Sequence, residues 1–224
     1  MRGACMSNRR GAVRLMGCVL AAATVLACGC NIAAPVAYAI TGPGKVKKVT
    51  SLDEERSYVI FIDDPSSKVA SRRLRGEIAT TAQDALLKRG VVKNMIDGRS
   101  AFTAASGERY GERLSVQEIG QSVKADVVIY ALLTQFTLGE EIGTFRPSAT
   151  LQVKLIESST GDRIWPPDVE TMYPLVVSMP QRPGMVPSTV SELQKAQQEL
   201  ADYSGLALAQ MFYDVEVNRS NRRP

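Results

Sequence analysis

Two apolar runs without polar alternation predict strands that are buried on both faces. They span 58–62 and 127–133, and both are rich in β-branched and aromatic residues. Such runs fit the inner strands of a sheet that helices cover on two sides. Residues 149–155 instead alternate between apolar and polar, which predicts a strand with one buried and one solvent-facing side. A turn at 158–162 and a return strand from Arg163 would complete a hairpin.

The first predicted helix follows the first buried run. Asp63 and Asp64 precede Pro65, and an aspartate before proline fits an N-cap followed by proline at the first helical position. Apolar residues then recur at helical spacing. We expect the helix to end at Gly90, because glycine readily adopts the left-handed conformation found just after helix ends.

Capping-box spacing marks the starts of two further helices. Ser115 and Glu118 would begin a short helix before the second buried strand, and Thr189 and Glu192 would begin a long amphipathic helix near the C-terminus. The remaining segments are a short strand starting at 91–92, a surface loop at 97–113, an edge segment at 172–177 and a proline-bounded loop at 180–187.

These elements predict an α/β fold with the order β-α-β-α-β-β-β-α, in which about three helices pack on a mixed central sheet. We expect one domain at 51–217, a length that suits a single hydrophobic core. Residues 28–50 are predicted to be a tether. The polar residues 218–224 are predicted to be a disordered tail.

The first 27 residues are predicted to be a lipoprotein signal peptide. Four arginines without an acidic residue precede the apolar run 15–27, which as a helix is about 20 Å long, too short to cross a ~30 Å hydrocarbon core. All four cysteines lie in the first thirty residues, and Cys28 and Cys30 follow small residues in a lipobox-like pattern. Cys28 is the preferred lipidation site and Cys30 the alternative. An ordinary cleaved signal with incidental cysteines, or an uncleaved anchor, stays open.

Composition excludes several function classes. The chain has a formal net charge of +4, from 27 Lys+Arg and 23 Asp+Glu, but four of the arginines lie in the signal peptide (27 − 4 = 23). The mature chain is therefore formally neutral, and we expect no nucleic-acid partner. There is no histidine, and no cysteine follows position 30. This excludes His-based metal sites, Ser-His-Asp and Cys-His nucleophiles, and disulfides in the folded part, so we expect no enzyme, metal or cofactor.

A few residues remain as candidate sites. Asp63 and Asp64 lie where a buried strand ends and a helix is predicted to begin, a place where ligands, phosphates or Mg²⁺ collect in open α/β sheets. The favoured interpretation is that Asp64 caps the helix and Asp63 is solvated. Trp165 could anchor an interface, although burial at the hairpin end is favoured. Glu140 and Glu141 could form an acidic contact surface, although solvated loop charge is favoured.

Three segments carry a resemblance to a known family. They are 120–131 (GQSVKADVVIYA), 145–153 (FRPSATLQV) and 159–165 (STGDRIW). They resemble the domain shared by CsgG-type curli-secretion lipoproteins and are similar to LpoB-type lipoprotein activators of penicillin-binding proteins. The chain departs from the family pattern at Lys124 and Ala131, where the family usually has glycine. The resemblance implies an α/β domain that is tethered to the outer membrane, faces the periplasm and works by protein contact.

Together these features predict a non-enzymatic envelope lipoprotein. Acyl chains would hold it at a membrane, the tether would give reach, and the domain would bind an envelope protein or a copy of itself. Two alternatives stay open. One is a metal- or nucleotide-responsive domain centred on Asp63 and Asp64, and the other is a self-assembling subunit of a secretion complex.

Overall fold

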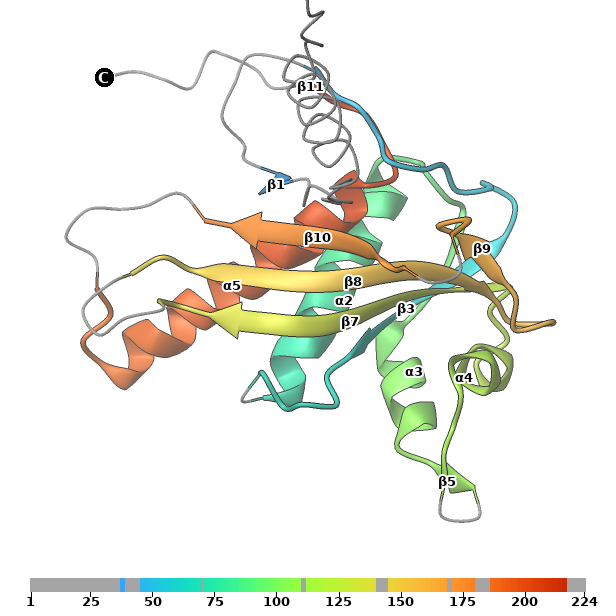
Figure 1. Cartoon of the computed structure of the whole chain (residues 1–224), viewed down its shortest axis with the longest axis horizontal. Helices are drawn as coiled ribbons and strands as arrows, with labels where there is room; N and C mark the ends of the chain where they lie inside the picture. The colour runs from blue at the N-terminus through green and yellow to red at the C-terminus, as the bar shows by residue number, and fades with distance from the viewer. Residues whose placement is uncertain are drawn as a thin grey trace, which may run out of the picture. The chain divides into compact units, whose positions relative to one another are not determined.

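A mixed sheet forms the centre of the computed structural model (Figure 1). The structure describes residues 37–38, 45–69, 71–109, 112–139, 145–168, 171–179 and 186–216. The sheet has the strand order β1-β10-β8-β7-β3-β4, and β9 pairs with β8 beside this path. The bounds are β1 (Ala37–Tyr38), β3 (Ser57–Asp63), β4 (Asn94–Ile96), β7 (Val127–Thr137), β8 (Ser148–Glu157), β9 (Arg163–Trp165) and β10 (Tyr173–Ser178).

The sheet combines a parallel and an antiparallel part. β3 is parallel to both β4 and β7, whereas β8 is antiparallel to β7, β9 and β10. The residues of β3 from Tyr58 to Ile62 are all buried, as their continuous apolar run predicts. The alternation in β8 also appears in its burial pattern. The α/β class and the mixed sheet are therefore confirmed.

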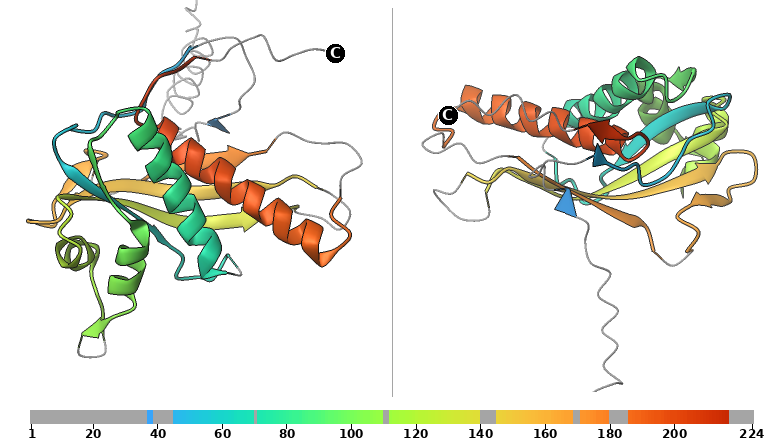
Figure 2. Two further views of the ribbon diagram at one scale, coloured as in Figure 1. Left: turned by 180° about the vertical axis from the view of Figure 1, so that it is seen from behind. Right: turned by 90° about the horizontal axis from the view of Figure 1, so that it is seen from above.

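Two long helices cover one face of the sheet. They are α2 (Arg72–Lys88) and α5 (Val190–Gln210), which lie side by side over the strands (Figure 2). Their apolar faces join the sheet in the larger core, where Ile60, Ile129 and Leu151 are fully buried. The helices approach closely because Gly205 of α5 has no side chain. A Cβ built there would lie 2.6 Å from the carbonyl oxygen of Ile78 in α2.

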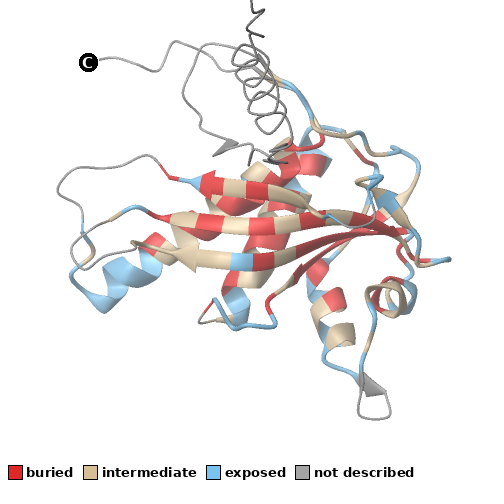
Figure 3. Ribbon diagram, viewed as in Figure 1, coloured by how far each residue is buried: buried red, intermediate tan, exposed pale blue. Residues whose placement is uncertain are grey.

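Two short helices cover only part of the opposite face. They are α3 (Gly98–Ala105) and α4 (Val116–Ser122), and they pack on β3 and β7 in a smaller core around Phe61 and Val128. The same face of β8 carries Gln152 and Lys154, which are only half-buried (Figure 3). This uneven cover explains why β3 is apolar throughout while β8 alternates.

The three predicted helices are present, and both capping boxes are confirmed. Ser115 and Glu118 exchange hydrogen bonds at the start of α4, and Thr189 and Glu192 do so at the start of α5. Gly90 follows the end of α2 with a positive φ of 64°, as predicted.

The predicted start of the first helix is wrong. Helix α2 begins at Arg72 with Ser71 as N-cap, and Asp64 instead lies in a loop where its carboxylate accepts hydrogen bonds from the backbone N–H groups of Lys68 and Val69. Ser67 has a φ of 51°, a left-handed conformation that a right-handed helix cannot contain. The turn after the strand therefore delays the helix.

The predicted surface loop at 97–113 is also wrong, since it contains α3. Asp97 caps this helix by accepting a hydrogen bond from the backbone N–H of Arg99. Gly98 is buried, and a Cβ there would lie 3.0 Å from both Ala79 Cβ and the Ile60 carbonyl oxygen. Small residues let α3 pack closely, so tertiary contact overrides a weak local signal. The short strand predicted from 91–92 begins later, at β4.

Short strands attach the two ends of the described chain to each other. β2 (Lys45–Val46) pairs antiparallel with β11 (Val215–Glu216), and the Val49 and Thr50 amides donate to the Met211 carbonyl oxygen. Residues 45–50, from the end of the predicted tether, thus lie against the C-terminal end of α5. A small hairpin, β5 (Glu108–Arg109) and β6 (Glu112–Arg113), joins α3 to α4. Among the described helices, none is both long and apolar enough to span a bilayer.

Candidate binding groove

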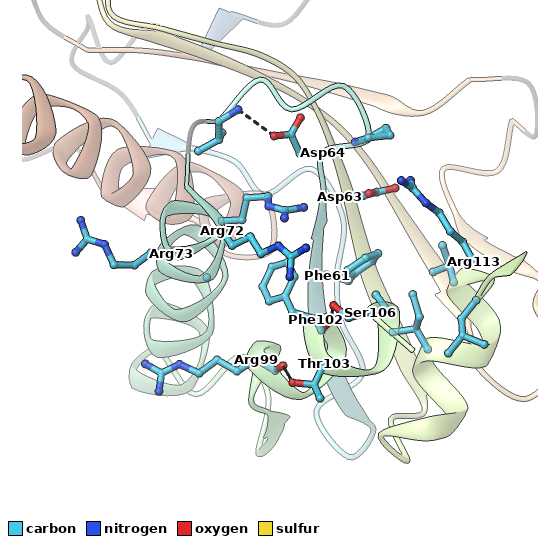
Figure 4. A pocket seen from close by; sticks show the side chains of 18 of the residues that line it. Phe61, Asp63, Asp64, Arg72, Arg73, Arg99, Phe102, Thr103, Ser106 and Arg113 are labelled. Atoms are coloured by element: carbon cyan, nitrogen blue, oxygen red, sulfur yellow. Dashed lines mark hydrogen bonds between the residues drawn. The ribbon is translucent and has the colours of Figure 1, made fainter. Parts of the chain in front are cut away.

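A groove of about 1110 Å³ opens at the end of β3. Side chains from β3, α2, α3, α4 and β6 line it (Figure 4). It therefore lies where the central parallel strand ends and the chain turns away, the place where open α/β sheets bind ligands. Packing of α2 against one face and of α3 and α4 against the other leaves this space between them.

Aromatic rings form an apolar part of the groove wall. Phe61 of β3 packs against Phe102 of α3, with ring centroids 5.7 Å apart. The guanidinium carbon of Arg75 lies 5.5 Å from the centroid of the Phe102 ring, within the range of a cation–π contact. Tyr130 of β7 lies beside Phe61, with its ring centroid 6.1 Å away. The wall thus offers planar apolar surface next to charge.

Both aspartates that the sequence singles out line the groove, but each already has partners. The Asp63 carboxylate accepts a hydrogen bond of 2.9 Å from the Tyr130 hydroxyl. Burial raises the pKa of Tyr130, and the hydrogen bond and charge of Asp63 raise it further. Asp64 is buried and uses both carboxylate oxygens to accept the backbone N–H groups of the loop, at 2.7 and 2.9 Å. Asp64 therefore holds the loop in shape, and the ligand role of this pair stays a prediction.

Five arginines line the same space. They are Arg72, Arg73 and Arg75 in the first turn of α2, Arg99 in α3 and Arg113 in β6, and we call this space the arginine groove. None of their guanidinium groups forms an ion pair with the part of the chain that the structure describes. In Figure 4, Arg72 and Arg113 extend over the groove and Arg99 reaches from α3 toward α2, whereas Arg73 points away from the other labelled side chains.

The sequence pattern alone does not predict this arginine cluster. Arg72, Arg73 and Arg75 follow one another at the start of a helix that has no acidic residue in its first turn. Helices usually prefer acidic residues there because the N-terminal end of the dipole is positive. That unfavourable placement is the one local signal of the cluster. The addition of Arg99 and Arg113 depends on the tertiary fold.

The other predicted site residues lie elsewhere. Trp165 is half-buried against the larger core, with its ring centroid 5.1 Å from that of Tyr173. This is the face that α2 and α5 cover, so Trp165 does not contribute to the arginine groove. The predicted signal peptide, both candidate lipidation cysteines Cys28 and Cys30, the loop glutamates Glu140 and Glu141, and the predicted tail 218–224 are outside the described residues.

The described side chains do not form a cluster of metal-ligand residues. Within the described ranges, no three residues of the types His, Cys, Asp and Glu cluster closely enough to hold a metal ion. In the pair Asp63 and Asp64, hydrogen bonds accepted from the Tyr130 hydroxyl and from loop N–H groups already occupy acceptor positions.

Comparison with known proteins finds similarity only among solved structures. No protein-family model and no curated protein matches the sequence. The PelC dodecamer from Paraburkholderia phytofirmans matches with a TM-score of 0.42 at 8% identity, over 76% of this chain and 96% of that one. Lipoprotein GNA1162 from Neisseria meningitidis matches with a TM-score of 0.37 at 12% identity, over 66% and 96%. The LpoB C-terminal domain from Salmonella enterica matches with a TM-score of 0.35 at 16% identity, over 58% and 86%.

The LpoB domain is thus among the structural matches, as is one protein described as a lipoprotein. At TM-scores and identities this low, the likenesses carry no argument about what this chain does. The CsgG-type branch of the sequence resemblance stays a prediction.

Proposed function

We propose that this protein is a lipid-anchored envelope lipoprotein whose α/β domain is a non-catalytic binding module for another envelope protein. The observation that carries the proposal is the N-terminal sequence, where Cys28 and Cys30 end a short apolar run that follows a cluster of arginines. This arrangement is typical of a lipoprotein signal. The acylated protein would lie at the outer membrane and face the periplasm.

The domain supports a binding role more than a catalytic one. Its groove presents arginines and aromatic rings, which are common at the centres of protein interfaces. The chain has no histidine, and the two groove aspartates are held by Tyr130 and by loop amides. A lipid anchor would add to this by concentrating the domain near its partner.

Mass spectrometry of the protein extracted from native membranes tests the anchor. We expect a mature chain that begins with an acylated Cys28, or with an acylated Cys30 if the alternative lipobox is used. The variants Cys28→Ser and Cys30→Ser should locate the acceptor, and Cys18→Ser is the matched control that should leave acylation unchanged. A purified native chain that begins at Met1 without an acyl group would refute the proposal.

Crosslinking in intact cells tests the binding role. We expect a second envelope protein to be crosslinked reproducibly to the domain. Crosslinks between copies of this chain alone would instead favour the self-assembling alternative. A rise in melting temperature with Mg²⁺ or a nucleotide would favour the ligand-responsive alternative, because a ligand that binds only the folded state must stabilise it.

A further inference from the structure

We propose that the arginine groove binds an acidic segment of a partner protein. This inference rests on the proposed function and names the chemistry of the partner. Five arginines line the groove, against the three carboxylates of Asp63, Asp64 and Glu77. Two of these carboxylates are hydrogen-bonded to Tyr130 and to loop amides, while the arginines form no ion pair with any residue that the structure describes.

The position of the arginines makes the groove receptive to anions. Three of them lie in the first turn of α2, which contains no acidic residue. The positive end of the helix dipole disfavours cations there, and each neighbouring arginine adds repulsion. An incoming negative charge relieves both effects at once. The cluster therefore costs the isolated domain electrostatic energy that a bound anion recovers.

The groove suits carboxylates on a peptide better than a compact phosphate. Phosphates are commonly held by free backbone N–H groups at helix N-termini. Here Ser71 Oγ already accepts the backbone N–H of Arg73, and Asp97 Oδ1 accepts that of Arg99, at the starts of α2 and α3. Each cap thus takes one of the N–H groups that a phosphate would use, and the guanidinium groups supply most of the donors; they pair with carboxylates, as with phosphates, through two parallel hydrogen bonds.

The size and wall of the groove also fit a peptide. Its volume of about 1110 Å³ lies above the usual range of about 300–1,000 Å³ for small-molecule pockets. The half-buried Phe102 ring, which packs on the almost fully buried Phe61 ring, provides apolar contact in the same groove as the arginines. An extended segment that alternates acidic and apolar side chains would use both features.

The groove lies away from the described strand that is nearest in sequence to the predicted lipidation site. β1 is the described element nearest in sequence to the predicted lipidation site, and it lies four strands from β3 in the sheet, or roughly 19 Å at about 4.8 Å per strand. β2 and β11 lie near the C-terminal end of α2, where Arg89 stacks on Tyr213. The groove is at the other end of α2, about 25 Å away at ~1.5 Å per residue.

Fluorescence anisotropy with a labelled peptide of alternating glutamate and phenylalanine tests the inference. The protein is the full mature chain in detergent at about 0.15 M salt, where weak charge attraction is screened. The groove variant is Arg72→Gln with Arg113→Gln, because both side chains are exposed and extend over the groove. The matched control is Lys88→Gln with Lys195→Gln, which removes the same charge from exposed positions outside it.

We expect the wild-type protein and the control to bind the peptide with similar Kd values. The groove variant should bind it roughly fivefold or more weakly, since exposed charge pairs contribute modestly and add up. A peptide in which lysine replaces glutamate should not bind. Absence of binding to the acidic peptide, or equal weakening in both variants, would overturn the inference.

A parallel measurement with vesicles separates the membrane from a protein partner. If anionic phosphatidylglycerol vesicles bind in an Arg72- and Arg113-dependent way while the peptide does not bind, the groove is a lipid site and the inference is wrong. A wrong assignment of the groove can be told apart from a wrong proposal about the lipoprotein function. Acylation of Cys28 or Cys30 and crosslinks to an envelope protein would persist in the groove variant if only the groove assignment were wrong.

Discussion

Replacing Gly205 with alanine should destabilise the protein even though alanine favours helices. In a helix interior this exchange gains about 0.8–1 kcal/mol from propensity. At Gly205 the new Cβ would lie 2.6 Å from the Ile78 carbonyl oxygen and 2.7 Å from Thr81 Cβ. The first of these is backbone and cannot rotate away, so α2 and α5 must separate, and overpacking of this kind costs about 1–3 kcal/mol or more. A contact of 2.6 Å with backbone belongs in the upper part of this range, at about 2–3 kcal/mol, so we expect a net loss of about 1–2 kcal/mol.

Thermal and urea unfolding of the full mature chain measure this effect. The expected loss lowers Tm by about 2–8 °C for a domain of this size. Gly76→Ala is the matched control, since Gly76 lies in α2 and a Cβ there meets nothing within 4 Å. It should raise the unfolding free energy by up to about 1 kcal/mol. If Gly205→Ala proves as stable as the wild type, the close approach of α2 and α5 does not limit the packing, and the reasoning fails.

Three further substitutions test local features. Ser115→Ala removes the cap of α4 and should lower the free energy of unfolding, measured in urea, by about 1 kcal/mol. Ser159→Ala, at an exposed turn, is the control and should change nothing measurable. The backbone and side-chain hydrogen bonds from Ser57 lower the pKa of Asp126, so their stabilisation is present at neutral pH and is lost as acid protonates the carboxylate below about pH 4. The stability advantage of wild type over Asp126→Asn should therefore shrink on acidification, and an advantage that grows would contradict this sign. The hydroxyl of Ser158 is buried and has no hydrogen-bond partner among the residues that the structure describes. Ser158→Ala should therefore unfold at the same or a higher urea concentration, and a clear loss would show that the hydroxyl is bonded.

Local signals explain which parts of the fold were predictable. The buried run of β3, the alternation of β8 and both capping boxes depend on residues within a few positions of one another. Each therefore appears in the sequence as it does in the structure. The predicted start of α2 was wrong because a proline after an aspartate is only a statistical signal for a helix start. The hydrogen bonds that the Asp64 carboxylate accepts from the Lys68 and Val69 N–H groups form a turn there instead.

The candidate site was predictable only in part. Asp63 and Asp64 were placed correctly at the end of a buried strand, which becomes the edge of the groove. Asp64 was expected to cap the helix, but it is buried in a loop instead. Asp63 was expected to be solvated, but it accepts a hydrogen bond from Tyr130. Tyr130 belongs to a strand 67 residues further along the chain, and nothing in the sequence near Asp63 indicates this partner.

The sequence by itself determined the main strands β3, β7 and β8 in their order along the chain, the existence of the helices α2, α4 and α5, and the lack of histidine side chains. Periodicity, capping residues and composition act over one or two turns of chain, so they need no tertiary contact. Only the tertiary structure decided that 98–105 is a helix, and that arginines 41 positions apart, from Arg72 to Arg113, line one groove. The physical reason is that α3 depends on burial against β3 and α2, and that β3 brings α2, α3 and β6 to one end of the sheet.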